Sequence, residues 1–236
     1  MKAGAIFLFT VAAAWAAGGS PPLDPAAIVE HYCAASRGEA QLLEGATMDV
    51  EIAASLPKLQ RQGRLHALRH ISALGRITYE KLRFEGDNTV KSQVIARYLS
   101  AEAEAQSGQS PSLEVIPANY KFKYKGLGAL NGRDVHIFQV TPRKRRSGLF
   151  KGEVWIDAAT YLRLQESGSL VKTPSVFLKR VDFVRKYEIR DGVSVPLQVK
   201  STVDTRLAGT AELTIDYTNF SVPAQWRDGA GDATLQ

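Results

Sequence analysis

Alternation between apolar and polar residues along most of the chain is the feature that most limits its fold. In "YKFKYK" at residues 120–125, three aromatic side chains alternate with three lysines. A period of two places one kind of side chain on each face of a β-strand. Comparable runs, separated by turn signals such as Asn131-Gly132 and Asp191-Gly192, occur at 47–55, 63–72, 76–86, 133–142, 148–164, 175–189, 193–203 and 207–220. The pattern predicts an antiparallel meander of nine or ten strands with one apolar face.

Helical signals are few. Asp24 followed by Pro25 is a good helix start, and apolar residues then recur at helical spacing until Gly45. We expect one helix of about 20 residues there, or one that breaks near Gly38. Residues 89–105 fit either a helix or a strand, and we favour a strand that runs into a frayed or helical end.

So little helix cannot cover so much sheet. Nine strands about 4.8 Å apart would be about 40 Å wide, whereas one helix covers about 10 Å. An open sheet would therefore expose more apolar surface than soluble monomers usually tolerate. The sheet must curl, as a barrel, as a half-barrel around a helix, or as two packed layers. The first two leave an apolar interior that can hold a ligand, and the third fills completely.

The N-terminus differs from the rest of the chain. "MKAGAIFLFTVAAAWAAGG" has one lysine, a short apolar run and a small-x-small cleavage site, as a secretory signal peptide does. We predict a signal peptide at 1–16, a single domain at 24–222 and a loose tail at 223–236. Cys33, the only cysteine, cannot form an internal disulfide, and we expect a small buried side chain rather than a nucleophile.

Motifs that would indicate catalysis are missing from the sequence. The four histidines, His31, His66, His70 and His136, do not form an HExxH pattern, and there is no G-x-S-x-G, phosphate-loop or CxxC motif. Asp157 fits a cap on the turn that follows it better than a general acid. We therefore predict no enzyme, no cofactor and no metal site. A hydrolase would need a cleft with a histidine beside a carboxylate or hydroxyl.

Positive charge is modest overall but concentrated at one place. The formal net charge is +6, and "TPRKRRSG" contains four consecutive cations, Arg143, Lys144, Arg145 and Arg146. This run is either a solvated hairpin tip or a contact for anionic lipid headgroups or an acidic partner. Each cation near an anionic surface contributes about 1 kcal/mol. The export signal disfavours a nucleic-acid partner.

The hairpin around this basic run resembles a known family. "VTPRKRRSGLFKGEVWIDAATYLRLQESG" is similar to the central hairpin of the periplasmic lipoprotein-carrier and lipoprotein-receptor (LolA/LolB-like) superfamily. The residues that match are Val140–Pro142, Trp155–Asp157 and Thr160, and the similarity extends over about residues 115–222. The resemblance implies an α+β fold, mainly antiparallel β, in which a strongly curved half-barrel sheet wraps over one or two helices.

The resemblance also implies a function. Its members hold acyl chains in a hydrophobic cavity during lipoprotein sorting to the outer membrane, and burial alone supplies about 0.8 kcal/mol per methylene. We expect an exported, periplasmic protein that binds the acyl chains of a lipoprotein or lipid. The alternative is an envelope scaffold or stress-sensor module that binds another protein. The candidate cavity residues are Ile28, Tyr32, Val154, Ile156, Leu162, Leu164, Phe177, Val181, Phe183, Tyr187, Val195, Leu197, Val199, Leu213, Ile215 and Tyr217.

Overall fold

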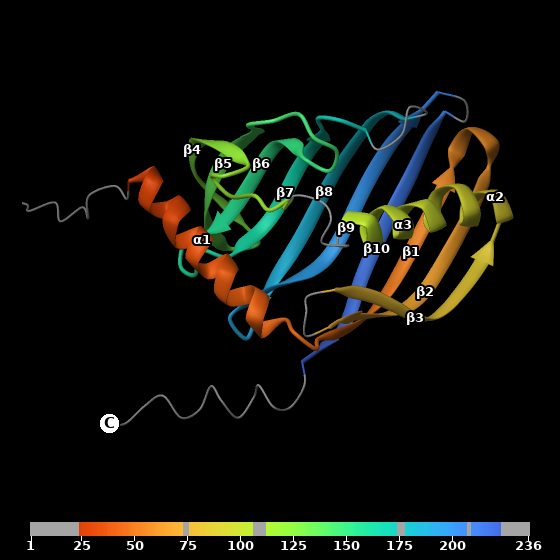
Figure 1. Ribbon diagram of the computed structural model, residues 1–236, viewed down its shortest axis with the longest axis horizontal. Coiled ribbons are helices and arrows are strands. Elements are labelled where there is room, and N and C mark those ends of the chain that lie inside the picture. Colours follow the sequence, from red (N-terminus) through yellow and green to blue (C-terminus); the bar gives the residue numbers. More distant parts are fainter. Residues whose placement is uncertain (1–23, 73–75, 106–111, 174–177, 207–208, 223–236) are drawn as a thin grey trace, which may run out of the picture.

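Ten antiparallel strands form one sheet, and two helical segments lie on its concave face (Figure 1). The computed structural model describes residues 24–72, 76–105, 112–173, 178–206 and 209–222. The strands are β1 Thr47–Leu56, β2 Arg61–Ile71, β3 Ile77–Gly86, β4 Tyr120–Leu130, β5 Arg133–Pro142, β6 Phe150–Asp157, β7 Arg163–Leu170, β8 Leu178–Arg190, β9 Val193–Thr205 and β10 Thr210–Ser221. The predicted meander and its α+β class are confirmed.

The order of strands in the sheet explains the long connection in the middle of the chain. That order is β3-β2-β1-β10-β9-β8-β7-β6-β5-β4, so the sheet is not closed into a barrel and β3 and β4 are its two edges. The chain between these edges must cross the whole sheet, about 43 Å at 4.8 Å per strand. Residues 88–105 form the first part of this crossing and lie across the concave face (Figure 1).

Two of the predicted turns are found as expected. Asn131 (φ 50°) and Gly132 (φ 78°) connect β4 to β5, and Asp191 (φ 49°) and Gly192 (φ 77°) connect β8 to β9. Both pairs adopt the left-handed dihedrals that a two-residue hairpin needs, and Asn-Gly and Asp-Gly tolerate them best.

The first helix, α1 (Pro25–Leu42), begins as predicted. The Oδ1 atom of Asp24 accepts a hydrogen bond from the backbone N–H of Ala26 at 3.1 Å, and Pro25 occupies the first turn. The helix continues through Gly38 without a break. In the part of the chain that the structure describes, no helix combines the length and the apolar character needed to cross a membrane.

The prediction of a strand at 89–105 was wrong. Residues 88–105 form one continuous helical segment: α2 (Asn88–Val90), a π-helical turn at Lys91–Ile95, and α3 (Ala96–Ala105). Asp87 caps its start, accepting hydrogen bonds from the backbone N–H groups of Thr89 and Val90. The apolar residues that contact the sheet are Val90, Val94, Ile95, Tyr98 and Leu99. Their spacing of four and five residues matches one helix face, and this contact with the sheet decides the conformation.

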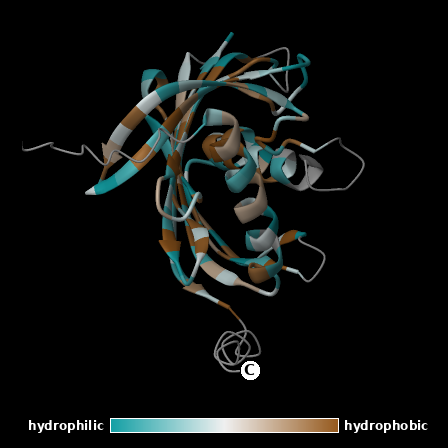
Figure 2. Ribbon diagram, turned by 90° about the vertical axis from the view of Figure 1, so that its left-hand side faces the viewer, coloured by the Kyte–Doolittle hydropathy of each residue, from teal (hydrophilic) through white to brown (hydrophobic). Residues whose placement is uncertain are grey.

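The core consists of two separate apolar clusters on the concave face. Cluster A lies under the 88–105 helix and contains Met48, Val50, Ile52, Ala54, Leu56, Leu65, Ala67, Val90, Ile95, Ala211, Leu213, Ile215 and Tyr217. Cluster B lies under α1 and contains Ile28, Val29, Tyr32, Val115, Tyr120, Phe138, Val140, Leu149, Phe150, Val154, Ile156 and Phe183. Figure 2 shows the helices enclosed by the curve of the sheet. Each helix thus covers one end of the sheet.

Alanine substitutions at two glycines should change the unfolding free energy in opposite directions. A Cβ on Gly152 in β6 would lie 1.8 Å from the carbonyl oxygen of Ser167 in β7, so Gly152→Ala forces two strands apart. We expect a loss of about 3 kcal/mol in unfolding free energy. A Cβ on Gly38, inside α1, meets none of the described atoms within 4 Å, and Gly38→Ala should stabilise by about 0.5–1 kcal/mol. Urea unfolding checks both, and two effects of the same sign would contradict this packing.

Candidate functional site on the concave face

One row of directly facing residues crosses all ten strands and shows the character of the concave face. It is apolar or aromatic at both ends and charged only in the middle, where β7 faces β8. From edge to edge the row reads Tyr124, Phe138, Val154, Glu166, Arg185, Val199, Ile215, Ile52, Leu65 and Phe84. The centre of the sheet therefore carries an ion pair between the two apolar clusters.

The carboxylate of Glu166 is the centre of this polar region. Its side chain is only 3% exposed, and it accepts hydrogen bonds from Arg185 Nη1 at 3.3 Å and from the Tyr187 hydroxyl at 3.2 Å. Arg163 Nη1 lies 3.7 Å from its other oxygen. A buried carboxylate is tolerated only with such partners, because it has lost its water. Glu166 thereby holds two guanidinium groups on the concave face.

A second carboxylate connects α1 to the same group. Glu39, near the end of α1, is buried and accepts a 2.7 Å hydrogen bond from the backbone N–H of Ser194 in β9. Its other oxygen lies 3.5 Å from Arg163 Nη2. Burial raises the pKa of Glu39, and Arg163 and the Ser194 N–H oppose that rise. Glu39 is thus the polar link between α1 and the sheet.

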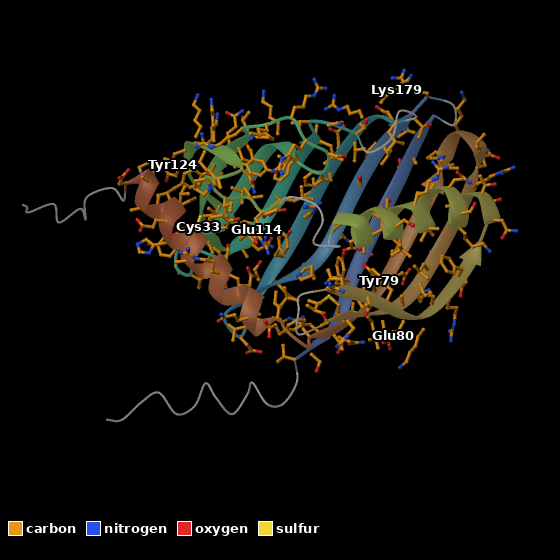
Figure 3. The ribbon with its side chains drawn as sticks, in the orientation of Figure 1. Cys33, Tyr79, Glu80, Glu114, Tyr124 and Lys179 are labelled. Atoms are coloured by element: carbon orange, nitrogen blue, oxygen red, sulfur yellow. The ribbon has the colours of Figure 1, made fainter. Side chains whose placement is uncertain are left out.

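The 88–105 helix is linked in a similar way. Glu102 of α3 accepts a 2.5 Å hydrogen bond from the Tyr79 hydroxyl and lies 3.7 Å from Arg69 of β2. Figure 3 labels Tyr79, on β3 beside α3. The Arg69 guanidinium also lies over the Tyr217 ring, 5.7 Å from its centroid. Each helix therefore presents one glutamate to an arginine of the sheet.

The polar centre remains accessible to solvent although it lies between the two helices. The Arg185 side chain is 42% exposed and that of Arg163 is 29% exposed. Arg163 lies over the Tyr187 ring at 5.0 Å and Arg185 over the Phe183 ring at 4.5 Å. Burial, and the Glu166 carboxylate next to it, raise the pKa of Tyr187, so its hydroxyl stays protonated and donates. The region offers hydrogen-bond donors beside aromatic surface, as an amphiphile requires.

The structure divides the predicted cavity residues among several places. Cluster A takes Leu213, Ile215 and Tyr217, with Val199 packed against it, and cluster B takes Ile28, Tyr32, Val154, Ile156 and Phe183. Leu162, Leu164 and Val195 are buried outside both clusters, and Val181 and Tyr187 are half-buried. Phe177 lies outside the described residues.

Leu197 does not point into the core. Its side chain is 40% exposed. The pairing of β8 with β9 shifts at this point, because Lys186 faces Gln198 whereas Tyr187 faces Pro196. Leu197 is therefore the extra residue of a bulge, and strict alternation along β9 assigned it to the wrong face.

Two hollows among the described residues lie away from these side chains. One of about 310 Å³ is lined by Thr141, Pro142, Lys144, Arg145 and Val171. A smaller one, of about 150 Å³, lies over β1, β2 and β10 and is lined by Ala53, Ala54, Ser55, Gln62, Gly63, Arg64, Glu212 and Thr214. Neither includes a predicted cavity residue, since the helices fill the space above both clusters.

Asp157 has the structural role expected of it. Its Oδ2 atom accepts hydrogen bonds from the backbone N–H and the hydroxyl of Thr160, at 3.0 and 2.8 Å, and Oδ1 accepts one from Arg133. Burial alone would raise the pKa of Asp157, but these hydrogen bonds outweigh it and lower the pKa. His136 is buried and lies 3.2 Å from the Tyr124 hydroxyl. Among the described residues, no three His, Cys, Asp or Glu side chains gather as metal ligands would.

The charged centre was missed by the sequence analysis, although a signal for it exists. Glu166 follows Leu162 and Leu164 at the same parity, and Arg185 lies between Phe183 and Tyr187 at the apolar parity of β8. A glutamate and an arginine at inward positions of neighbouring strands indicate a buried pair, since either alone would be costly.

Removing the central charge should destabilise the sheet. Glu166→Gln removes the carboxylate next to Arg185 and leaves Arg163 with Glu39 alone, and we expect a loss of about 2 kcal/mol. The value is below that of a fully buried pair because both arginines keep contact with water. The exposed Glu85 provides the control Glu85→Gln, which should change stability little. A loss below about 0.5 kcal/mol on urea unfolding would contradict the assigned role.

The lowered pKa of Asp157 predicts that the stability of the protein depends on pH. Because its pKa is lowered in the folded state, its contribution is present above the unfolded pKa of about 3.9 and is lost as pH falls through the folded value. The difference in unfolding free energy between the wild type and Asp157→Asn should therefore shrink as pH falls below about 4. A difference that is constant with pH would speak against these hydrogen bonds.

Comparison with known proteins finds similarity in structure only. No protein-family model and no curated protein matches the sequence. Among solved structures, a DUF1329 family protein from Desulfovibrio piger is 14% identical, with 89% of this chain and 95% of that chain covered and a TM-score of 0.43. A putative outer membrane lipoprotein-sorting protein domain from Vibrio parahaemolyticus is 12% identical, with 88% and 93% covered and a TM-score of 0.42.

A LolA superfamily protein from Nitrosomonas europaea is 10% identical, with 86% of this chain and 94% of that chain covered and a TM-score of 0.37. The chain is thus similar in structure to a solved member of the superfamily that the central hairpin resembles. Identities and TM-scores this low carry no statement about ligand or partner.

Proposed function

We propose that the protein is an exported, periplasmic binding protein that holds the acyl chains of a lipid or lipoprotein on the concave face of its sheet. The observation that carries the proposal is the central row of the sheet, apolar on both sides of a solvated polar centre. An amphiphile needs both surfaces next to each other. Its chain would lie against one apolar cluster and its polar end at the Arg163–Glu166–Arg185 centre.

Entry of a chain requires a helix to move, because the helices fill the space above the clusters. The described polar links include Glu39 for α1, and Glu102 and Thr89 for the 88–105 helix, where Thr89 accepts a hydrogen bond from Arg61 of β2. A chain that replaces the apolar face of a helix keeps the cluster dry, and each buried methylene contributes about 0.8 kcal/mol. The helices then act as covers that a ligand displaces.

Co-purified lipid is the first test. Protein produced with residues 1–16 intact should carry lipid that mass spectrometry detects after purification. Ligand-free protein should bind a fluorescent fatty acid, and the absence of affinity for this probe would overturn the proposal.

A pair of tryptophan substitutions on opposite faces of the sheet locates the binding surface. Val199 lies on the concave face, between Arg185 and Ile215 in the central row, whereas Val184 lies on the convex face between Ser167 and Lys200. Val199→Trp should reduce affinity for the fluorescent fatty acid about tenfold, because a ring of this size fills the space beside the polar centre. Val184→Trp should leave the affinity unchanged. Equal effects of the two substitutions would exclude the concave face.

The open edge at β3 favours a second candidate, a scaffold that binds another envelope protein. Leu82 and Phe84 on β3 are exposed. An edge strand with apolar side chains can accept a strand from a partner. This function would give a stable crosslinked complex that Val199→Trp does not affect.

A further inference from the structure

The structure divides the basic run at 143–146 into two pairs with different roles. Arg143 Nε donates to the carbonyl oxygen of Pro117 at 2.7 Å, and Arg146 Nη2 donates to the carbonyl oxygen of Ser112 at 3.2 Å and to Asn119 Oδ1 at 3.0 Å. These two arginines hold segment 112–119 against the hairpin. Both have a structural role, and Arg146 is half-buried, whereas Arg143 remains exposed as Lys144 and Arg145 do.

Lys144 and Arg145 lie at the rim of the hollow of about 310 Å³. Its other lining residues are Thr141, Pro142 and Val171, so the floor between the two cations is largely apolar. Arg145 Nε donates to the carbonyl oxygen of Val171 at 2.7 Å, which fixes the guanidinium at the rim. The hollow therefore combines a cationic edge with an apolar base.

More cations surround this hollow. The neighbouring segments 112–125, 139–153 and 168–173 contain two acids, Glu114 and Glu153, and nine lysines and arginines: Lys121, Lys123, Lys125, Arg143, Lys144, Arg145, Arg146, Lys151 and Lys172. Strand pairing brings the three segments together, since Lys121 faces Thr141 and Lys151 faces Ser169. We call this region the basic corner. At its border, Asp182 is already paired with Arg180 at 2.6 Å.

Protection of a sheet edge explains only part of the basic corner. Lys121, Lys123 and Lys125 are exposed on β4, an edge strand, and lysines there prevent pairing with another sheet. Lys144, Lys151 and Lys172 are also exposed but lie on the 143–149 loop, on β6 and after β7, away from that edge. Their presence around an apolar hollow calls for a different explanation.

We propose that the basic corner docks the protein on an anionic phospholipid surface. Cations spread over a loop and several strands match a surface of diffuse negative charge, and an apolar hollow between them suits the apolar part of a lipid near its head group. This surface is separate from the concave face and goes beyond the acyl-binding function. It brings the carrier to a membrane, whereas the concave face would hold the cargo.

Vesicle binding tests the proposal with the full chain and a matched pair of variants. The corner variant carries Lys144→Glu, Lys151→Glu and Lys172→Glu, and the control carries Lys179→Glu, Lys186→Glu and Lys200→Glu, on β8 and β9 (Lys179 is labelled in Figure 3). All six lysines are exposed, and each triple substitution reduces the formal net charge from +6 to 0. Circular dichroism confirms that both variants fold.

Wild-type protein should bind vesicles that contain phosphatidylglycerol but not pure phosphatidylcholine vesicles, and salt should weaken the binding. The corner variant should bind about tenfold or more weakly than the control, with unchanged affinity for the fluorescent fatty acid. Equal losses in both variants, or no binding by the wild type, would overturn the proposal. Wild-type binding to polyglutamate but not to anionic vesicles would also overturn it, in favour of an acidic protein partner.

Discussion

A single buried carboxylate organises the inside of this protein. Glu166 lies at the middle of a ten-stranded sheet, where water is largely excluded from its oxygens, and it must keep its partners. Arg185, Tyr187 and Arg163 supply them. Through Arg163 the same network reaches Glu39 and so fixes the end of α1. One charge at the sheet centre thereby sets the position of side chains on two strands, β7 and β8, and of one helix.

That charge also explains why the core has two parts. A continuous apolar face on so wide a sheet would need a continuous cover, and the described part of the chain places two helical segments on it. The polar residues lie between the two clusters, and the partly exposed Arg185 and Arg163 let water reach this part of the concave face. The two apolar clusters stay buried, while the residues between them remain accessible to solvent.

Much of the fold could be predicted from the sequence, because alternation reports directly on which face of a strand a residue occupies. Tyr120, Phe122 and Tyr124 illustrate this, with their lysine neighbours exposed. Prediction failed where alternation is interrupted or ambiguous. Leu197 lies in a bulge that only the pairing of two strands reveals, and residues 89–105 fit two periods until the sheet that they cover is known.

The candidate site was harder to predict because its residues depend on long-range partners. From the sequence alone, Arg185 resembles a surface residue. Its role becomes clear only when β7 pairs with β8 and Glu166 faces it. The basic run was visible in the sequence, but the hydrogen bonds that its arginines make were not. Arg143 and Arg146 donate to carbonyl oxygens and an amide oxygen of residues 112–119, which no local pattern announces.

The position of β1 beside β10 has a consequence for how the molecule is made. Ile52 of β1 faces Ile215 of β10, although the two are far apart in sequence. The three strands β1, β2 and β3 therefore have no other strand of the sheet to pair with until β10 forms. Cluster A cannot close before then, because it draws residues from both ends. Closure of cluster A must therefore wait until β10 has been synthesised, a contact of long sequence separation that slows folding.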